Sequence, residues 1–177
     1  VKMVTSLSDF FRTTLSKGHD YITVKEERTH IESYLEIQQF RYQDILDYEI
    51  QMDEEIYGYI IPKLTLQPLV ENALYHGIKN KRGKGKILIT GKKQGDKIIF
   101  QVIDNGKGMT EEELNSLRKK MAGTDTGDEA KGFGVSNVNQ RIKYYYGEEY
   151  GVFFESKENE GTNATIIIAA KNIQLLS

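Results

Sequence analysis

The chain has 177 residues, of which 38% are hydrophobic and 28% charged, and it contains no cysteine. This length suits one packed domain with an appendage, and the missing cysteines exclude a disulfide framework and a thiolate metal site. The 24 basic and 26 acidic residues nearly balance, so nucleic-acid binding is not expected. No apolar run reaches the ~18 residues of a membrane span. Because the chain begins at Val1, we expect it to be part of a longer protein, and this absence describes only the part.

Two helices are predicted at the start of the chain. Apolar residues recur at helical spacing from residue 6 to residue 16, and Gly18 follows as a stop signal. A second helix is predicted from Thr23, which has capping-box spacing to Glu26, to about Tyr42. Residues 48–52 then alternate like a strand. We therefore place a domain boundary near Asp44, between a helical appendage (residues 1–44) and an α/β domain (residues 45–177).

The rest of the chain alternates helices and strands. Pro62 is expected in the first turn of a helix that carries Glu71 and Asn72. Residues 86–92 and 97–104 predict a hairpin, and the capping-box spacing of Thr110 and Glu113 opens a helix that reaches about residue 121. The polar, glycine-rich stretch 122–134 predicts a mobile lid or binding loop. A helix over 135–146 and strands over 152–155 and 164–169 complete the predicted elements.

The sequence Asp104-Asn-Gly106-Lys-Gly108-Met109 follows an apolar strand. A partly buried carboxylate at Asp104 could accept a hydrogen bond from the amino group of an adenine. Gly106 and Gly108 would let backbone approach the base and take positive φ, and Met109 completes the segment. For an isolated match, a plain turn after a strand is the better interpretation.

The predicted helix with Glu71 and Asn72 offers a second set of polar groups in an apolar stretch. The amide oxygen of Asn72 suits Mg²⁺, which takes few protein ligands and keeps phosphate oxygens and waters. Glu71 could act as a general base. Both residues could instead face solvent on an ordinary amphipathic helix. His76 is a weaker candidate for a phosphate contact, because a lone histidine is more often found at a helix end or on the surface.

A third glycine segment precedes the predicted helix over 135–146. Free N–H groups at Gly132 and Gly134, with Val135 and Asn137 in the first turns, could hold phosphate. A lone Gly-x-Gly before a helix is common, and Asn137 could equally belong to a solvated face. The chain has no phosphate loop ending in Gly-Lys-Ser/Thr and no six-residue dinucleotide fingerprint. The hydroxyl of Thr162 could lie near the adenine, or Thr162 could simply begin a strand.

Taken in order, these segments resemble the N, G1, G2 and G3 boxes of the ATP-binding superfamily of gyrase, heat-shock chaperones, sensor histidine kinases and mismatch-repair ATPases. Residues 7–12, 24–27 and 34–42 further resemble sensor kinases of the LytS/YesM type. The resemblance implies an α+β fold: a two-layer α/β sandwich of the Bergerat type. Its sheet would be mixed and mostly antiparallel, with helices on one face and a short N-terminal helical segment. It also implies ATP and Mg²⁺ as ligands, with Asn72 on the metal.

By the same resemblance, the chain is the ATP-binding catalytic domain of a two-component sensor histidine kinase. It would transfer the γ-phosphoryl group to an upstream histidine, and a response regulator would receive it. The intact kinase would be a homodimer, and this part would be the cytoplasmic domain of a membrane-anchored bacterial sensor, attached only through absent N-terminal parts. The family's Pro-His-Phe phosphoacceptor segment is missing, and neither His19 nor His30 is expected to replace it. The fragment should therefore bind ATP without phosphorylating itself.

Three alternatives remain. A serine/threonine kinase that acts as an anti-sigma factor and an ATP-driven clamp share the superfamily, but the helical segment before Asp44 is atypical of both. The third is a non-catalytic module that binds nucleotide weakly or binds only a protein. Tyr75 slightly favours this module, because many relatives carry a basic residue at that position.

Overall fold

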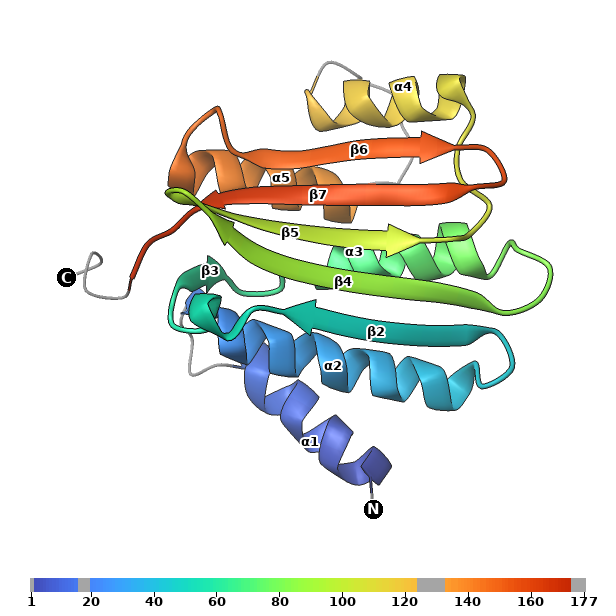
Figure 1. Cartoon of the computed structure of the whole chain (residues 1–177), viewed down its shortest axis with the longest axis horizontal. Coiled ribbons are helices and arrows are strands. Elements are labelled where there is room, and N and C mark those ends of the chain that lie inside the picture. The colour runs from blue at the N-terminus through green and yellow to red at the C-terminus, as the bar shows by residue number, and fades with distance from the viewer. Residues whose placement is uncertain (1, 16–19, 124–132, 173–177) are drawn as a thin grey trace.

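The computed structural model describes residues 2–15, 20–123 and 133–172, which form a sheet covered by helices (Figure 1). The helical segments are α1 (Lys2–Leu15), α2 (Val24–Arg41), η2 (Glu54–Ile56), α3 (Gln67–Asn72), η3 (Ala73–Ile78), α4 (Glu111–Met121) and α5 (Phe133–Tyr146). The strands are β1 (Tyr21–Thr23), β2 (Leu46–Met52), β3 (Ile60–Pro62), β4 (Gly85–Gln94), β5 (Lys97–Asp104), β6 (Gly151–Lys157) and β7 (Gly161–Ala169).

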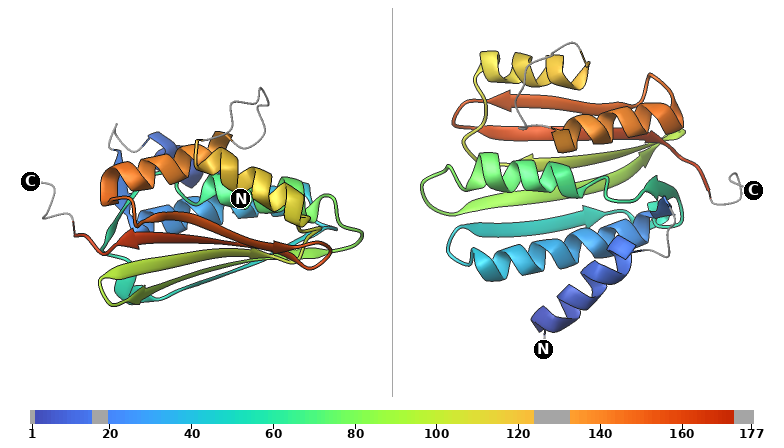
Figure 2. Two further views of the ribbon diagram at one scale, coloured as in Figure 1. Left: turned by 90° about the horizontal axis from the view of Figure 1, so that it is seen from above. Right: turned by 180° about the vertical axis from the view of Figure 1, so that it is seen from behind.

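The main sheet has five strands in the order β2-β4-β5-β7-β6. The β2–β4 pair is parallel, whereas β4–β5, β5–β7 and β6–β7 are antiparallel. The helices lie on one face of this sheet (Figure 2). The predicted fold, a two-layer sandwich with a mixed and mostly antiparallel sheet, is confirmed. So is the hairpin between β4 and β5, which turns through Gly95 and Asp96.

The core lies between the sheet and the helices. Along β5 the side chains alternate, so that Ile98, Phe100 and Val102 are buried toward the helices. From α2, Ile31 and Leu35 are buried in the same core. The apolar packing is therefore continuous on both sides of residue 44, and the division of the chain there stays a prediction.

The expectation for Pro62 is wrong. Pro62 ends strand β3, where it pairs with Tyr21 of β1 in a separate two-stranded sheet. Pro68 is the proline in the first turn of α3. Strands of three residues carry too little alternation to be recognised in sequence, because they depend on a partner that is distant along the chain.

The helix that carries Asn72 also differs from the uniform helix expected. After Asn72 the backbone continues as the π-helix η3, in which the Lys79 N–H donates to the carbonyl of Leu74 at 2.9 Å. Apolar spacing cannot distinguish this widened turn from an α-helix. Single π turns are rare and frequently occur at functional sites.

The two later helices are largely as predicted. Thr110 and Glu113 form the expected capping box at the start of α4. Helix α5 begins at Phe133, two residues before the predicted start. Most of the predicted lid, residues 124–132, lies outside the described residues.

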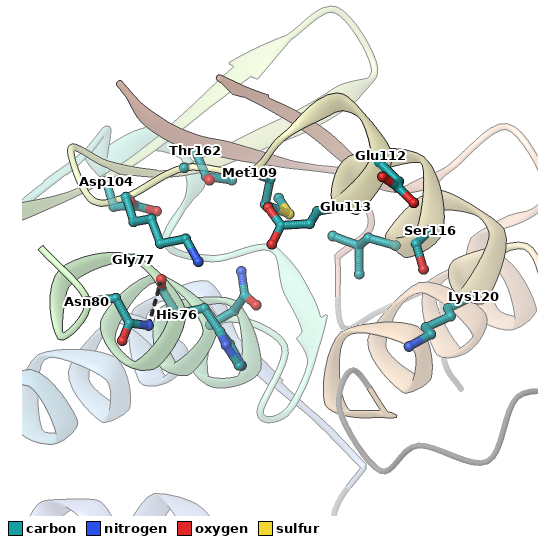
Figure 3. A pocket seen from close by; sticks show the side chains of 14 residues that line it. His76, Gly77, Asn80, Asp104, Met109, Glu112, Glu113, Ser116, Lys120 and Thr162 are labelled. Atoms are coloured by element: carbon teal, nitrogen blue, oxygen red, sulfur yellow. Dashed lines mark hydrogen bonds between the residues drawn. The ribbon is translucent and has the colours of Figure 1, made fainter. Parts of the chain in front are cut away.

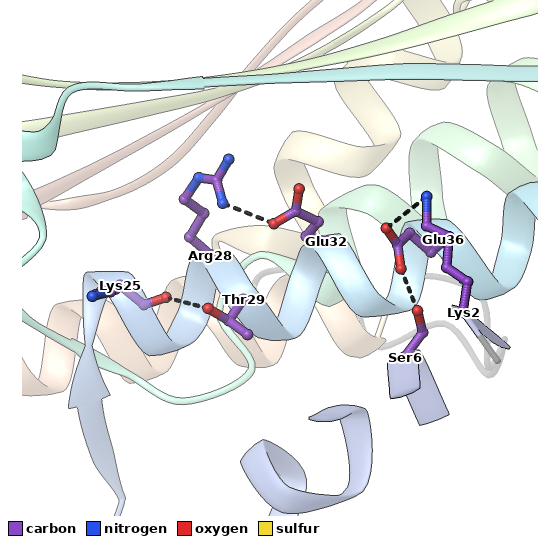
Figure 4. A network of polar contacts seen from close by, with 7 residues as sticks. All are labelled: Lys2, Ser6, Lys25, Arg28, Thr29, Glu32 and Glu36. Atoms are coloured by element: carbon purple, nitrogen blue, oxygen red, sulfur yellow. Dashed lines mark hydrogen bonds and ion pairs between the residues drawn. The ribbon is translucent and has the colours of Figure 1, made fainter. Parts of the chain in front are cut away.

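Polar contacts join the N-terminal helices (Figure 4). Glu36 of α2 accepts a hydrogen bond from Ser6 and pairs with Lys2 at 3.2 Å. Such partly exposed pairs contribute little free energy to the stability of the fold. Of the helices within the described ranges, none is long and apolar enough to cross a membrane.

A buried carboxylate fixes the start of α3. Glu27 of α2 accepts hydrogen bonds from the backbone N–H groups of Leu66 at 2.9 Å and Leu64 at 3.1 Å. It takes the place of the side-chain cap that α3 lacks at Leu66. Burial raises the pKa of Glu27 to about 7, although the backbone hydrogen bonds from Leu66, Leu64 and Thr65 and the nearby Arg141 oppose this shift.

This shift predicts a pH-dependent contribution to stability. Because the folded-state pKa of about 7 exceeds the ordinary glutamate pKa of 4.5, the folded state binds the proton more tightly. The contribution of Glu27 is therefore full below about pH 4.5 and is lost as the pH rises through 7. Glu27→Gln removes the titration. Urea unfolding should show the wild-type stability, relative to this variant, falling by about 2 kcal/mol between pH 5.5 and 8. A difference that does not change with pH would contradict the prediction.

Candidate functional site

A cavity of about 500 Å³ opens between η3, the segment after β5, and α4 (Figure 3). Predicted site residues that line it are Asn72, His76, Asp104, Gly108, Met109 and Thr162. Further lining residues are Gly77, Asn80, Lys107, Glu112, Glu113, Ser116, Leu117 and Lys120. The fold thus brings together the segments that contain Asn72, Asp104 and Thr162, although Asn72 and Thr162 lie 90 positions apart in the chain.

Asp104 is the last residue of β5, and the alternation of that strand turns its side chain toward the helices. It is 5% exposed. Its Oδ1 accepts a hydrogen bond from the Gly106 N–H at 2.8 Å. Burial raises the pKa of Asp104 to about 6, against the opposing effects of the backbone N–H groups of Gly106 and Thr162 and of Lys81. The carboxylate is thus anchored by backbone while it lines the cavity.

Backbone segments pack closely around Asp104. A Cβ at Gly77 would lie 2.6 Å from Asp104 Oδ1, and one at Gly106 would lie 2.3 Å from the carbonyl carbon of Gly77. Only glycine fits at either position. Of the two glycines predicted to take positive φ, Gly108 does so at 66°, whereas Gly106 is not among the residues with positive φ. The expectation of a positive φ at Gly106 is therefore wrong, because its missing side chain makes room for η3. Its predicted contact with the nucleotide stays a prediction.

Ser156 on strand β6 contacts two residues that line the cavity, Met109 and Thr162. The hydroxyl of Ser156 accepts a hydrogen bond from the Met109 N–H at 2.8 Å and lies 2.8 Å from the hydroxyl of Thr162. The Ser156 hydroxyl also donates to the carbonyl of Gly161 at 3.0 Å. Ser156 therefore ties the backbone at Met109 to Thr162, and the β6–β7 register pairs it with Thr162 beside the site.

Asn72 lines the cavity at the end of α3. Within the described residues no group of three or more histidine and acidic side chains could hold a metal ion. One amide oxygen suits Mg²⁺ that is held mainly by nucleotide phosphates and water. His76 is exposed beside the same cavity, and its carbonyl accepts a hydrogen bond from the Asn80 amide at 3.3 Å (Figure 3).

Other predicted site residues are not among those that line this cavity. Glu71 lies on α3 next to Asn72, but its Oε1 accepts a hydrogen bond from Gln67 Nε2 at 2.9 Å. At the start of α5, Gly134 is exposed, Val135 is buried and Asn137 is exposed. Gly132 lies outside the described residues. The roles of these residues stay predictions.

Sequence reasoning missed several residues that line the cavity. Gly77 stands in the middle of an apolar helical stretch, which was a usable signal for close backbone approach. Lys107 lies between two recognised glycines. Ser116, Leu117 and Lys120 carried no signal, because only the packing of α4 beside β6 places them there.

The sheet, the helix-covered face and the glycine-lined cavity are features of an ATP-binding domain. Residues 62–172 match the family model described as Histidine kinase-, DNA gyrase B-, and HSP90-like ATPase, and residues 1–46 match the model described as Histidine kinase. The chain therefore belongs to the histidine kinase-, DNA gyrase B- and HSP90-like ATPase family. Sensor kinases of the LytS and YesM type are among the relatives to which the chain is similar.

Over 97% of its length the chain is 34% identical to sensor histidine kinase YesM of Bacillus subtilis, of which it covers 28%. It is 29% identical to sensor protein LytS of Staphylococcus saprophyticus over 98% of its length, and covers 29% of that protein. The chain thus spans less than a third of these relatives.

Among solved structures, the catalytic domain of histidine kinase ThkA is 19% identical with a TM-score of 0.61, covering 86% of this chain and 97% of that one. The histidine kinase domain from Erythrobacter litoralis EL346 is 15% identical with a TM-score of 0.60, covering 96% of this chain and 73% of that one. At these identities the likeness shows the fold.

Proposed function

We propose that this chain binds Mg-ATP in the cavity and transfers the γ-phosphoryl group to a histidine that lies upstream in the intact kinase. The observation that carries the proposal is the buried Asp104 carboxylate, which lines one cavity together with Asn72, Gly108 and Thr162. Asp104 accepts a hydrogen bond from the adenine amino group, and Thr162 adds a hydroxyl nearby. Asn72 supplies the protein ligand to Mg²⁺.

In the proposed reaction, the bond between the γ-phosphorus and the β–γ bridging oxygen breaks, and a bond forms from the phosphorus to an imidazole nitrogen. ADP leaves with the electron pair of the broken bond, and the imidazole loses its N–H proton to Glu71. When bound, Mg²⁺ neutralises charge on the phosphates, and positioning supplies much of the remaining catalysis. Beside the cavity, His76 would contact phosphate. Gly132, Gly134, Val135 and Asn137 would hold phosphate at the positive end of α5.

The wider assignment rests on the relatives, which are named as sensor kinases or sensor proteins. We place residues 1–44 in the remnant of a dimerisation and phosphotransfer region and residues 45–177 in the catalytic domain. The intact kinase would be a homodimer, would pass the phosphoryl group to a response regulator, and would be anchored in the membrane by other segments, with this part in the cytoplasm. Apart from Tyr75, no feature of the described residues favours a non-catalytic module instead.

Calorimetry with ATP, ADP and GTP, with and without Mg²⁺, tests this function directly. We expect micromolar, adenine-selective binding. Asn72→Ala should weaken binding of Mg-ATP about tenfold and abolish the effect of Mg²⁺, because the metal loses its protein ligand. Asn80→Ala is the matched control: it removes another amide beside the cavity and should leave the Mg²⁺ effect intact. The absence of adenine-selective binding at millimolar ligand would refute the proposal.

A further inference from the structure

A chain of hydrogen bonds runs from α2 to Glu71. His30 Nε2 on α2 lies 2.7 Å from Gln67 Oε1, and Gln67 Nε2 donates to Glu71 Oε1 at 2.9 Å. Gln67 and Glu71 are four residues apart on α3, so their side chains lie on the same side of that helix. The side chains of His30 and Gln67 thus connect α2 to the proposed base.

The donors and acceptors of these side chains determine the direction of each hydrogen bond in this series. A carboxylate only accepts, so the donor end of the Gln67 amide must face Glu71 and its acceptor end must face His30. His30 must then carry its proton on Nε2. The imidazole is 0% exposed and stacks on Phe10 of α1 with ring centroids 4.8 Å apart. Burial lowers the pKa of His30, although the hydrogen bond with Gln67 opposes this shift, and the lowered pKa favours a neutral ring. Within the described residues, Nδ1 has no hydrogen-bond partner.

The two proposed catalytic residues of α3 face different surroundings. Asn72 lines the cavity, whereas Glu71 is directed toward α2. There it lies near Tyr34, where burial raises the pKa of the Tyr34 hydroxyl and the charge of Glu71 adds to the increase. One short helix thus presents an amide to the nucleotide and a carboxylate to the helical segment that precedes it. In the proposed function, the phosphoaccepting histidine lies upstream of that segment.

We propose that Gln67 and His30 are positioning residues, which orient the carboxylate of Glu71 for proton removal from the phosphoaccepting histidine. Gln67 occupies Oε1 and leaves Oε2 of Glu71 to take the proton. His30 fixes the Gln67 amide, and Phe10 fixes the His30 ring from α1. This inference rests on the proposed function, because it assumes that Glu71 acts in phosphoryl transfer.

The first test needs no substitution. The ¹⁵N shifts of the His30 imidazole, measured by NMR on this chain at pH 7, should show a neutral ring protonated on Nε2. Gln67→Leu removes the acceptor and should release this preference between the two nitrogens. A ring protonated on Nδ1, or a charged ring, would overturn the proposal, since the Gln67 amide could then not connect His30 to Glu71 in this direction.

The second test separates positioning from structure with two amide variants. His30→Gln places an N–H close to the position of Nε2, whereas the shorter side chain in His30→Asn reaches only the position of Nδ1. Autophosphorylation is measured in the natural kinase chain that contains this region and the upstream histidine. His30→Asn and Gln67→Leu should lower kcat about tenfold with KM for ATP unchanged, and His30→Gln should stay within about threefold of wild type.

The outcomes distinguish the two proposals. If the wild-type chain binds no ATP in calorimetry, the proposed function fails. If it binds ATP but His30→Asn and His30→Gln have equal rates, or if only KM changes, the positioning role fails while the ATP site stands. Circular dichroism shows whether each variant folds, and a variant that unfolds leaves the tautomer measurement on the wild-type chain to decide.

Discussion

Replacing Asp104 by Asn is expected to weaken ATP binding by roughly a hundredfold, or about 3 kcal/mol. Asn keeps the size of the side chain and can still accept the hydrogen bond from the Gly106 N–H, which Asp104 Oδ1 now accepts at 2.8 Å. Its other end becomes an NH₂ group, which would oppose the adenine amino group donor to donor. The fold should persist, because the neutral amide removes the burial cost that raises the pKa of Asp104.

Glu112→Gln is the matched control for this change. Glu112 also lines the cavity, but it is an exposed carboxylate on α4. Its replacement should change ATP affinity by less than about threefold, since an exposed charge is largely screened. Calorimetry on both variants measures the two ATP affinities, and thermal unfolding verifies that each variant is folded. If Asp104→Asn bound ATP within threefold of wild type, Asp104 would not be the adenine acceptor.

The substitution Gly108→Ala should have the largest effect on the fold around the site. Gly108 has φ 66°, and a Cβ there would lie 2.0 Å from the carbonyl oxygen of Lys157. The methyl group must push the segment after β5 away from β6. We expect a loss of at least about 3 kcal/mol in the free energy of unfolding, together with at least a tenfold loss of ATP affinity.

Gly95→Ala separates the cost of a positive φ from the cost of close packing. Gly95 has nearly the same φ, 62°, but no atom of the described residues lies within 4 Å of a Cβ at that turn. Its cost should be only the conformational one, about 1 kcal/mol, with ATP affinity unchanged. Urea denaturation of both variants measures the difference. Equal losses of stability would show that close packing at Gly108 contributes nothing beyond its positive φ.

Much of the fold follows from local patterns. The alternation in residues 97–104 predicted β5, and the residue types of Thr110 and Glu113 predicted the start of α4, because each of these patterns depends only on neighbours in the chain. The failures were at Pro62 and in the widened helix η3. Both depend on contacts with distant segments, which local propensity does not encode.

The site residues were also predicted from short segments of the sequence, and residues that reach the site only through distant contacts were missed. The sequence singled out Asp104, Asn72 and Thr162, which the structure then places around one cavity. It missed Gly77, whose role becomes visible only when η3 packs against Asp104. It also missed Ser156, which reaches Thr162 across the β6–β7 pair.

By itself, the sequence determined which polar groups and glycines are available and the order of the elements that carry them. It also carries the resemblance to the N, G1, G2 and G3 boxes, which implied the class of ATP-binding domain. Only the tertiary structure decided which way adjacent residues face. Asn72 and Glu71 are neighbours in the chain, yet one lines the cavity and the other is directed toward α2. The physical reason is that successive residues of a helix point about 100° apart, so the surroundings of each depend on which elements pack around that helix.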